Sequence, residues 1–132
     1  MVIVNREEAA HLTGVDYRKE RPMFRKFDEL IDGIAVMTDG KRGARVSDGT
    51  YIYTAGVFKE KEMVDRTGAG DAFGSGFVAG LMGKRDIHHA LRLASANATS
   101  VVESVGAHLG ALRKGQIDDK RWKYLDLDIE PL

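Results

Sequence analysis

The sequence predicts an α/β fold, because short apolar strands are followed by amphipathic helical stretches along its 132 residues. Two continuous apolar runs, at 2–4 and 34–38, predict buried strands. A glycine-rich turn at 68–70 precedes two consecutive helical patterns. The length suits one compact domain, and an apolar content of 43% can fill its core, so we expect a single domain over 1–132.

In the first half of the chain, turn and cap signals separate the expected elements. Gly14 stands at a C-cap position, where a left-handed backbone closes a helix. Asp48-Gly49 lies between two apolar runs and is the strongest hairpin signal in the chain. The expected elements are a strand at 2–4, a helix at 7–13, a helix at 24–31 ended by Gly33, a strand at 34–38 and a hairpin at 44–54.

The second half of the chain is rich in glycine but keeps a helical period. Phe73 and Phe77 belong to this period, which predicts a helix from Asp71 to Met82. A glycine inside a helix costs about 1 kcal/mol relative to alanine, so these glycines indicate close backbone packing. We expect this packing role for Gly74, Gly76 and Gly80.

Two further elements are expected after this helix. Asp86 is a plausible N-cap for a helix that continues to about Glu103 and is ended by Gly106. An amphipathic stretch at 117–125 is expected to pack back on the body of the protein.

The composition argues against several classes of partner. Twenty basic residues balance twenty acidic ones without a basic stripe, so neither a nucleic acid nor an anionic membrane is the expected partner. No apolar run approaches the ~20 residues that span a bilayer, and the N-terminus does not resemble a signal peptide. The absence of cysteine excludes disulfides and thiolate metal sites. We expect a cytoplasmic protein.

The turn before the glycine-rich helix can bind phosphate and abstract a proton. If a helix starts near Gly70, its first amide groups have no partner and lie at the positive end of the helix dipole. Small residues at 68–70 let a phosphate approach these amides. An acidic Asp71 beside them would repel phosphate as a mere ligand, but it fits a base that takes the proton of an attacking hydroxyl. The alternative is an acid that only complements the helix dipole.

Other phosphate-binding motifs fit less well. The Walker pattern fails because Gly83-Lys84 is followed by Arg85 and because Val78 stands where its first glycine belongs. The dinucleotide pattern fails because Phe73 takes the place of its third glycine. A dinucleotide-binding domain is therefore the weaker alternative.

Asp65 to Gly76, DRTGAGDAFGSG, closely resembles the C-terminal signature of the PfkB carbohydrate kinases, the ribokinase family. Four further segments are similar to family elements in the same order: Asn5-Arg6-Glu7-Glu8, Thr38-Asp39-Gly40-Lys41-Arg42-Gly43, Ala96-Asn97-Ala98 and Val105-Gly106-Ala107. The resemblance implies a ribokinase-like three-layer α/β/α fold. It covers only the C-terminal nucleotide-binding part, because family members are about twice as long and carry their substrate and lid half N-terminally.

The resemblance also implies an activity and a set of site residues. The activity is phosphoryl transfer from ATP to a hydroxyl of a sugar, nucleoside or related small molecule. A truncated module that only binds nucleotide or self-associates, for example as a homodimer, is the alternative. The implied site comprises Asp71 as base, the amides of Gly68, Ala69 and Gly70, Asn5 and Glu8 for Mg²⁺ through water, Thr38, Gly40 and Gly43 along the nucleotide, Asn97 at the adenine, and Asp65 and Thr67 at a monovalent-cation (K⁺) site.

Several of these residues have an equally simple structural interpretation. Asn5 and Glu8 could form a strand-end turn and a solvated helix acid. Asp65 and Thr67 could cap the turn by their side chains, and Asn97 could be a satisfied polar group. The four histidines do not form a metal-binding pattern, since His88 and His89 point about 100° apart on a helix.

Overall fold

The computed structural model describes residues 1–60, 68–84, 86–103 and 111–132. The chain forms two compact units, one made of residues 1–56 with 127–132 and the other of residues 57–126. The single-domain organisation stays a prediction.

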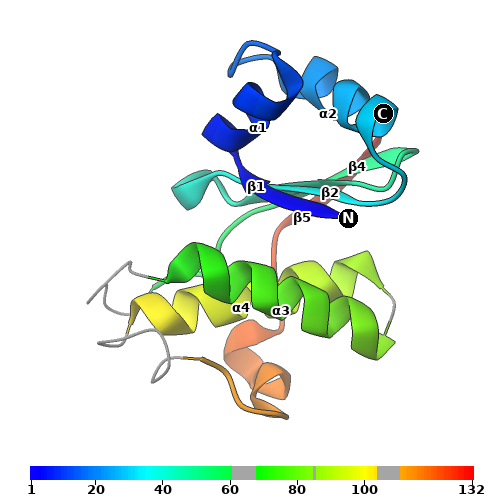
Figure 1. The fold of residues 1–132 in the computed structure, drawn as a ribbon. Coiled ribbons are helices and arrows are strands. Elements are labelled where there is room, and N and C mark those ends of the chain that lie inside the picture. The colour runs from blue at the N-terminus through cyan, green and yellow to red at the C-terminus, as the bar shows by residue number, and fades with distance from the viewer. Residues whose placement is uncertain (61–67, 85, 104–110) are drawn as a thin grey trace. The chain divides into compact units, whose positions relative to one another are not determined.

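The first unit is a five-stranded sheet with two helices on one face (Figure 1). The strands are ordered β1-β2-β3-β4-β5; β1 and β2 are parallel, and each later neighbour is antiparallel. Its elements are β1 (Val2–Asn5), α1 (Arg6–Thr13), α2 (Glu20–Leu30), β2 (Ala35–Thr38), a 3₁₀ turn (Gly40–Arg42), β3 (Ala44–Ser47), β4 (Tyr51–Ala55) and β5 (Leu127–Pro131).

The core of this unit lies between the sheet and α1 and α2. Phe24 and Phe27 of α2 pack against each other with ring centroids 6.1 Å apart. Gly14 ends α1 with a φ of 70°, as predicted for a left-handed C-cap. The buried members of this core are Ala9, Met23, Phe24, Phe27, Ala35, Met37 and Ile52.

The predicted hairpin joins β3 to β4, and Asp48 holds its turn. The Asp48 carboxylate accepts hydrogen bonds from the N–H groups of Thr50 and Tyr51 and from the hydroxyl of Tyr53. Burial raises the pKa of Asp48, but these three hydrogen bonds together outweigh burial and leave the pKa below its ordinary value. Gly49 supplies the positive φ of 92° that the turn needs.

The second unit is built on two packed helices, α3 (Ala69–Lys84) and α4 (Ile87–Val102). A Cβ placed on Gly76 would lie 2.9 Å from the Cα of Ala94, and one on Gly80 would lie 2.7 Å from the Cα of Ala90. Both glycines therefore serve the close helix packing that the sequence predicted. Asp86 is the N-cap of α4, as expected, and accepts a hydrogen bond from the N–H of His88.

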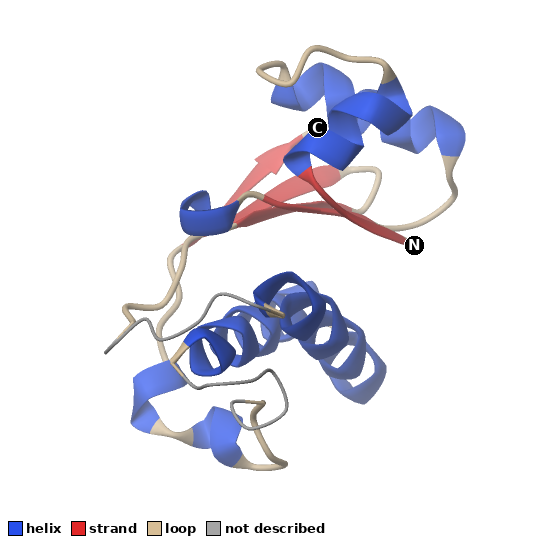
Figure 2. Cartoon of the chain, turned by 60° about the vertical axis from the view of Figure 1, so that its left-hand side comes forward, coloured by secondary structure: helices blue, strands red, loops and turns tan. Residues whose placement is uncertain are grey.

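The stretch that was expected to pack back on the body of the protein does pack on its unit. Residues 117–125 form no long helix but two 3₁₀ turns, Gln116–Asp118 and Lys120–Trp122 (Figure 2). Trp122 is buried and meets the ring of Phe58 edge-on, with centroids 5.1 Å apart. Ile117 and Leu125 pack on the same cluster, so several apolar side chains hold this stretch on its unit. Strand β5 follows it and was not predicted; most of its residues are exposed.

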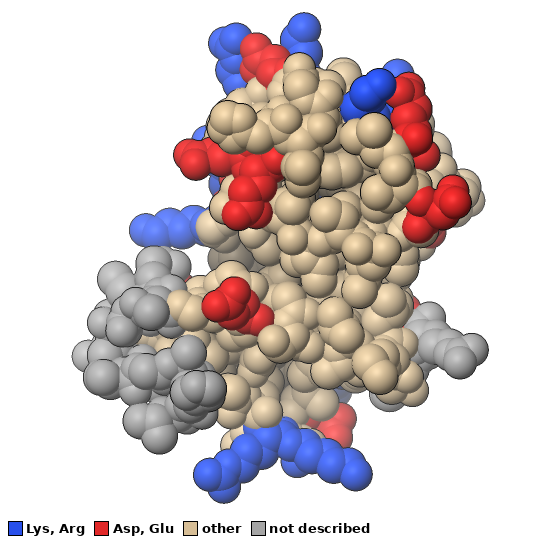
Figure 3. Space-filling view, in the orientation of Figure 1, with Lys and Arg blue, Asp and Glu red and all other residues tan. Residues whose placement is uncertain are grey.

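Charges of both signs lie in small groups on the face drawn in Figure 3. This distribution agrees with the equal numbers of basic and acidic residues in the sequence. Within the described ranges, none of the helices has the length and apolar character needed to cross a bilayer.

Candidate functional site

The N-terminus of α3 presents amide groups that the helix itself does not use. Gly68 has a φ of 82°, and its carbonyl accepts the first helical hydrogen bond, from the N–H of Ala72 at 2.8 Å. The amides of residues 69–71 come before that bond, and none of them donates to another described residue. Gly70 and Asp71 are exposed, and Ala69 is half-buried.

The same helix end combines a place for an anion with an acid. A Cβ on Gly70 would meet no atom within 4 Å, so the space beside this residue is open. The carboxylate of Asp71 makes no ion pair or hydrogen bond within the described part of the chain. Unpaired amides at the positive end of a helix stabilise a phosphate, and an adjacent carboxylate can accept a proton. Asp65 and Thr67 lie outside the described residues.

The side chain of Asn97 in α4 holds the first turn of α3 by a hydrogen bond. Its Nδ2 donates to the carbonyl of Ala72 at 2.8 Å, and its Oδ1 accepts from the N–H of Leu112 at 2.7 Å. The side-chain amide is thus satisfied within the fold and fixes the turn that carries Asp71. A contact of Asn97 with adenine stays a prediction.

A second group of predicted residues lies where the parallel strands β1 and β2 end. Asn5 and Thr38 are partners in the ladder, and the hydroxyl of Thr38 points at the carbonyl of Val4 at 3.5 Å. Asn5 and Glu8 form a capping box: Oδ1 of Asn5 accepts from the N–H of Glu8 at 2.8 Å, and Oε2 of Glu8 accepts from the N–H of Asn5 at 2.9 Å. The cap explains why these residue types stand here, and their role toward Mg²⁺ stays a prediction.

The turn after β2 is closed by its own backbone. The N–H of Asp39 donates to the carbonyl of Gly43 at 2.8 Å, and the N–H of Arg42 donates to the carbonyl of Asp39 at 3.0 Å. Gly43 has a φ of 85°, and a Cβ there would lie 1.9 Å from the carbonyl oxygen of Ala55, so the fold itself demands glycine. Gly40 has a φ of 55° with no atom in the way. The contacts of both glycines with a nucleotide stay predictions.

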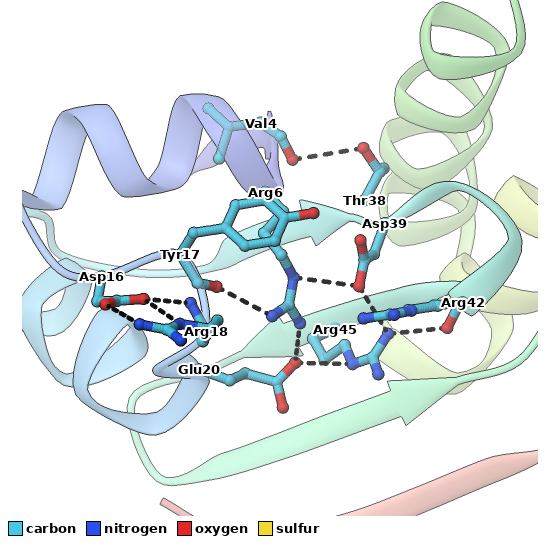
Figure 4. Close-up of polar contacts among 10 residues, drawn as sticks. All are labelled: Val4, Arg6, Asp16, Tyr17, Arg18, Glu20, Thr38, Asp39, Arg42 and Arg45. Atoms are coloured by element: carbon cyan, nitrogen blue, oxygen red, sulfur yellow. Dashed lines mark hydrogen bonds and ion pairs between the residues drawn. The ribbon is translucent and has the colours of Figure 1, made fainter.

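A buried ionic cluster lies beside this turn and was not predicted from the sequence (Figure 4). Its members are Arg6, Glu20, Asp39 and Arg45, whose side chains are 10%, 30%, 9% and 16% exposed. Arg6 lies in the segment Asn5-Arg6-Glu7-Glu8 and Asp39 in the segment 38–43, but neither was among the predicted site residues. These residues come from α1, α2, the turn after β2 and β3, and they meet only in the folded unit, so no spacing in the sequence could have revealed the cluster.

The predicted site residues thus form two groups, one in each unit. Residues 68–71 and Asn97 belong to the second unit, and Asn5, Glu8, Thr38, Gly40 and Gly43 belong to the first. In the first unit the group lies beyond the carboxyl ends of two parallel strands, which is the usual place of ligands in α/β proteins.

The comparisons with known proteins identify a family. A family model described as pfkB family carbohydrate kinase matches residues 1–114. The cytidine kinase of Thermococcus kodakarensis is 32% identical over 111 residues, which make up 80% of this chain and 38% of that protein. The chain thus spans about two fifths of the length of this curated relative.

Solved structures show the same fold. A ribokinase of Arabidopsis thaliana, complexed with ribose and ATP, matches 93% of this chain and 41% of its own with a TM-score of 0.80 at 22% identity. An E. coli protein classed as a ribokinase II, in complex with ATP and Mg²⁺, matches 86% of this chain and 36% of its own with a TM-score of 0.75 at 26% identity. These matches confirm that the chain has part of a ribokinase-like α/β fold. Since the family model matches most of its length, the chain belongs to the pfkB family of carbohydrate kinases.

Proposed function

We propose that this chain supplies the ATP site and the catalytic base for phosphoryl transfer to a hydroxyl of a sugar, nucleoside or related small molecule. The observation that carries the proposal is the row of unpaired amides at 69–71 beside the exposed carboxylate of Asp71. This is the arrangement that an attack on a phosphate requires, because charge gathers on phosphate oxygens while a proton leaves the attacking hydroxyl.

Each group at this helix end has one task in the proposed reaction. The carboxylate of Asp71 accepts the proton of the acceptor hydroxyl, whose oxygen then forms the new bond to the terminal phosphorus of ATP. The amides of residues 69–71 hold the transferring phosphoryl group and stabilise its negative charge. Asn97 keeps the first turn of α3 in place for both tasks.

The first unit is proposed to position the nucleotide and its metal. Thr38, Gly40 and Gly43 line the nucleotide, and Asn5 and Glu8 help to place Mg²⁺. The cap of α1 uses one oxygen of Glu8, Oε2, so an approach of hydrated Mg²⁺ to this carboxylate fits the residues present. Mg²⁺ keeps several of its waters and is usually bound by one or two carboxylates together with substrate phosphates. When bound, Mg²⁺ neutralises phosphate charge.

A nucleotide-binding module without turnover is the second candidate. The chain spans only 38% of the cytidine kinase that it matches, so residues that bind the acceptor are expected elsewhere. Calorimetry with MgATP tests binding by the 132-residue chain. An assay of ADP release that depends on an added sugar or nucleoside tests turnover, and we expect this chain alone to give none.

Two glycines of α3 provide a matched test of the phosphate site. A Cβ on Gly70 or on Gly83 would meet no atom within 4 Å, so alanine fits the fold at both positions. Only Gly70 lies in the turn with the unpaired amides. We expect Gly70→Ala to weaken MgATP binding about tenfold or more, because the methyl group keeps the phosphate away, and Gly83→Ala to leave binding unchanged. Equal affinities of the two variants would refute the phosphate site.

The role of Asp71 is tested by an isosteric change. Asp71→Asn keeps the shape of the side chain but removes the proton acceptor, and it also removes a negative charge next to phosphate. We expect MgATP affinity to be retained or increased in this chain, and turnover to be abolished in a protein that carries the complete family domain. A loss of binding that parallels the loss of turnover would mean that Asp71 is structural.

A further inference from the structure

The ionic cluster beside the 39–43 turn connects two predicted nucleotide-binding elements. Nε of Arg6 lies 3.1 Å from Oδ2 of Asp39, and NH2 of Arg6 donates to Oε1 of Glu20 at 2.9 Å. On the other side, Nε of Arg45 lies 2.8 Å from the same oxygen of Glu20, and its NH1 lies 3.9 Å from Oδ2 of Asp39. Figure 4 shows the two arginines on either side of the two acids.

Because the side chains of Arg6 and Asp39 are largely buried, their contact restricts the positions of the elements that carry them. The side chains of Arg6 and Asp39 are 10% and 9% exposed, so each charge depends on its partner instead of water. Nε of Arg6 and Oδ2 of Asp39 form no aligned hydrogen bond, so the attraction between their charges holds this contact. NH1 of Arg6 also donates to the carbonyl of Tyr17 at 3.1 Å, which fixes the guanidinium from a third side.

Arg6 and Asp39 belong to different elements, so the contact between their side chains joins these elements. Arg6 is the first residue of α1, directly after the capping residue Asn5. Asp39 begins the turn after β2, and both its N–H and its carbonyl are used to close that turn. The ladder between β1 and β2 ends at Asn5 and Thr38, so the contact of Arg6 with Asp39 extends the pairing by one residue through side chains.

We propose that Arg6 and Asp39 are positioning residues, which hold the capping box of α1 and the 39–43 turn at a fixed separation. The two elements then move as one body when they meet a nucleotide. This role rests on the proposed function, since it is there that both elements face the nucleotide. The cluster itself carries no net charge and donates no free cation to a phosphate, so it acts through the two elements.

Amide hydrogen exchange, followed by NMR on the 132-residue chain, tests this coupling without a ligand. In Arg6→Met we expect exchange to become about tenfold faster at Glu8, in the capping box, and at Asp39 and Gly43, in the turn. The N–H of Tyr51, which is held by Asp48 in the hairpin, should keep its rate. Faster exchange in only one of the two elements, or an equal increase throughout the sheet, would overturn the proposal.

A second ion pair of the same unit provides the control. Arg21 of α2 pairs with Glu130 and donates to the carbonyl of Pro131, but it is exposed and touches neither element. Arg21→Met should leave the exchange of Glu8, Asp39 and Gly43 unchanged. If Arg6→Met does not fold, Arg6→Lys keeps the charge but loses the planar fork, and the same amides are expected to respond to it.

Measurements of MgATP affinity distinguish a positioning role of Arg6 and Asp39 from a role in stability alone. The double variant Arg6→Met/Asp39→Leu removes both charges, leaves Glu20 paired with Arg45, and should be about as stable as the parent chain. We nevertheless expect its affinity for MgATP to fall about tenfold, while Arg21→Met binds as the parent does. Parent-like affinity in the double variant would overturn the positioning role. A parent chain that does not bind MgATP would refute the proposed function, and the exchange experiment would still decide the coupling.

Discussion

Replacement of Gly80 by alanine tests the close packing of α3 on α4. A helix-interior alanine gains about 1 kcal/mol over glycine from intrinsic propensity. At this position, however, the new Cβ would lie 2.7 Å from the Cα of Ala90 and 3.3 Å from its N. Carbon atoms in contact prefer about 3.5–4.0 Å, so the helices would have to separate by roughly 1 Å. Overpacking of this kind costs about 1–3 kcal/mol, which exceeds or cancels the gain.

Gly83 of the same helix is the control for this change. A Cβ there meets no atom within 4 Å, so Gly83→Ala keeps the gain in propensity without the clash. Thermal unfolding followed by circular dichroism should place Gly80→Ala below Gly83→Ala by about 1–3 kcal/mol, or several degrees in Tm. Because the obstructing atom is the backbone Cα of Ala90, the additional change Ala90→Gly should not restore stability. Equal melting of Gly80→Ala and Gly83→Ala would refute the reasoning.

Two further changes test single polar groups. Asn97→Ala should destabilise the second unit by about 1–3 kcal/mol, because the carbonyl of Ala72 and the N–H of Leu112 lose their partner. Urea unfolding with an unchanged m-value measures this loss of unfolding free energy. An unchanged unfolding free energy would contradict the bridging role of Asn97. Asp28→Asn should raise Tm at pH 7, because burial and the nearby charge of Asp48 raise the pKa of Asp28 and make its ionised form unfavourable in the fold. Because the pKa of Asp28 is higher in the folded chain than in the unfolded chain, the parent loses stability as pH rises from the unfolded pKa through the folded pKa. Near pH 3 the carboxyl group is protonated in both states, so the advantage of Asp28→Asn should vanish there. An advantage that persists at pH 3 would contradict this cause.

Local signals of the sequence predicted most of the fold correctly. The left-handed Gly14, the Asp48-Gly49 turn and the N-cap Asp86 act through their immediate neighbours, so their residue types suffice to place a cap or a turn. Helix α3 was also predicted despite its glycines, because Phe73 and Phe77 keep the helical period. Strand β5 was missed, since its pairing with β4 joins residues far apart in the chain and its own side chains are largely exposed.

In the candidate site, too, some features follow from the local sequence and others depend on the folded chain. The unpaired amides at 69–71 follow from the start of a helix, which is a local property, and the sequence predicted them. The capping box of Asn5 and Glu8 is local as well, but two interpretations of these residues were equally simple before the structure was known. The contact of Arg6 with Asp39 depends on the register of two strands and on the burial of both side chains, which only the folded chain reveals.

The four charges of the ionic cluster also limit how related proteins can diverge. Loss of one member would leave a charge of the cluster unbalanced, at a cost of up to about 3–5 kcal/mol, whereas loss of an opposite pair together costs little. Substitutions at Arg6, Glu20, Asp39 and Arg45 should therefore occur as matched pairs among homologues. An engineer who grafts the 39–43 loop from one kinase into another should transfer the arginine after the capping residue with it.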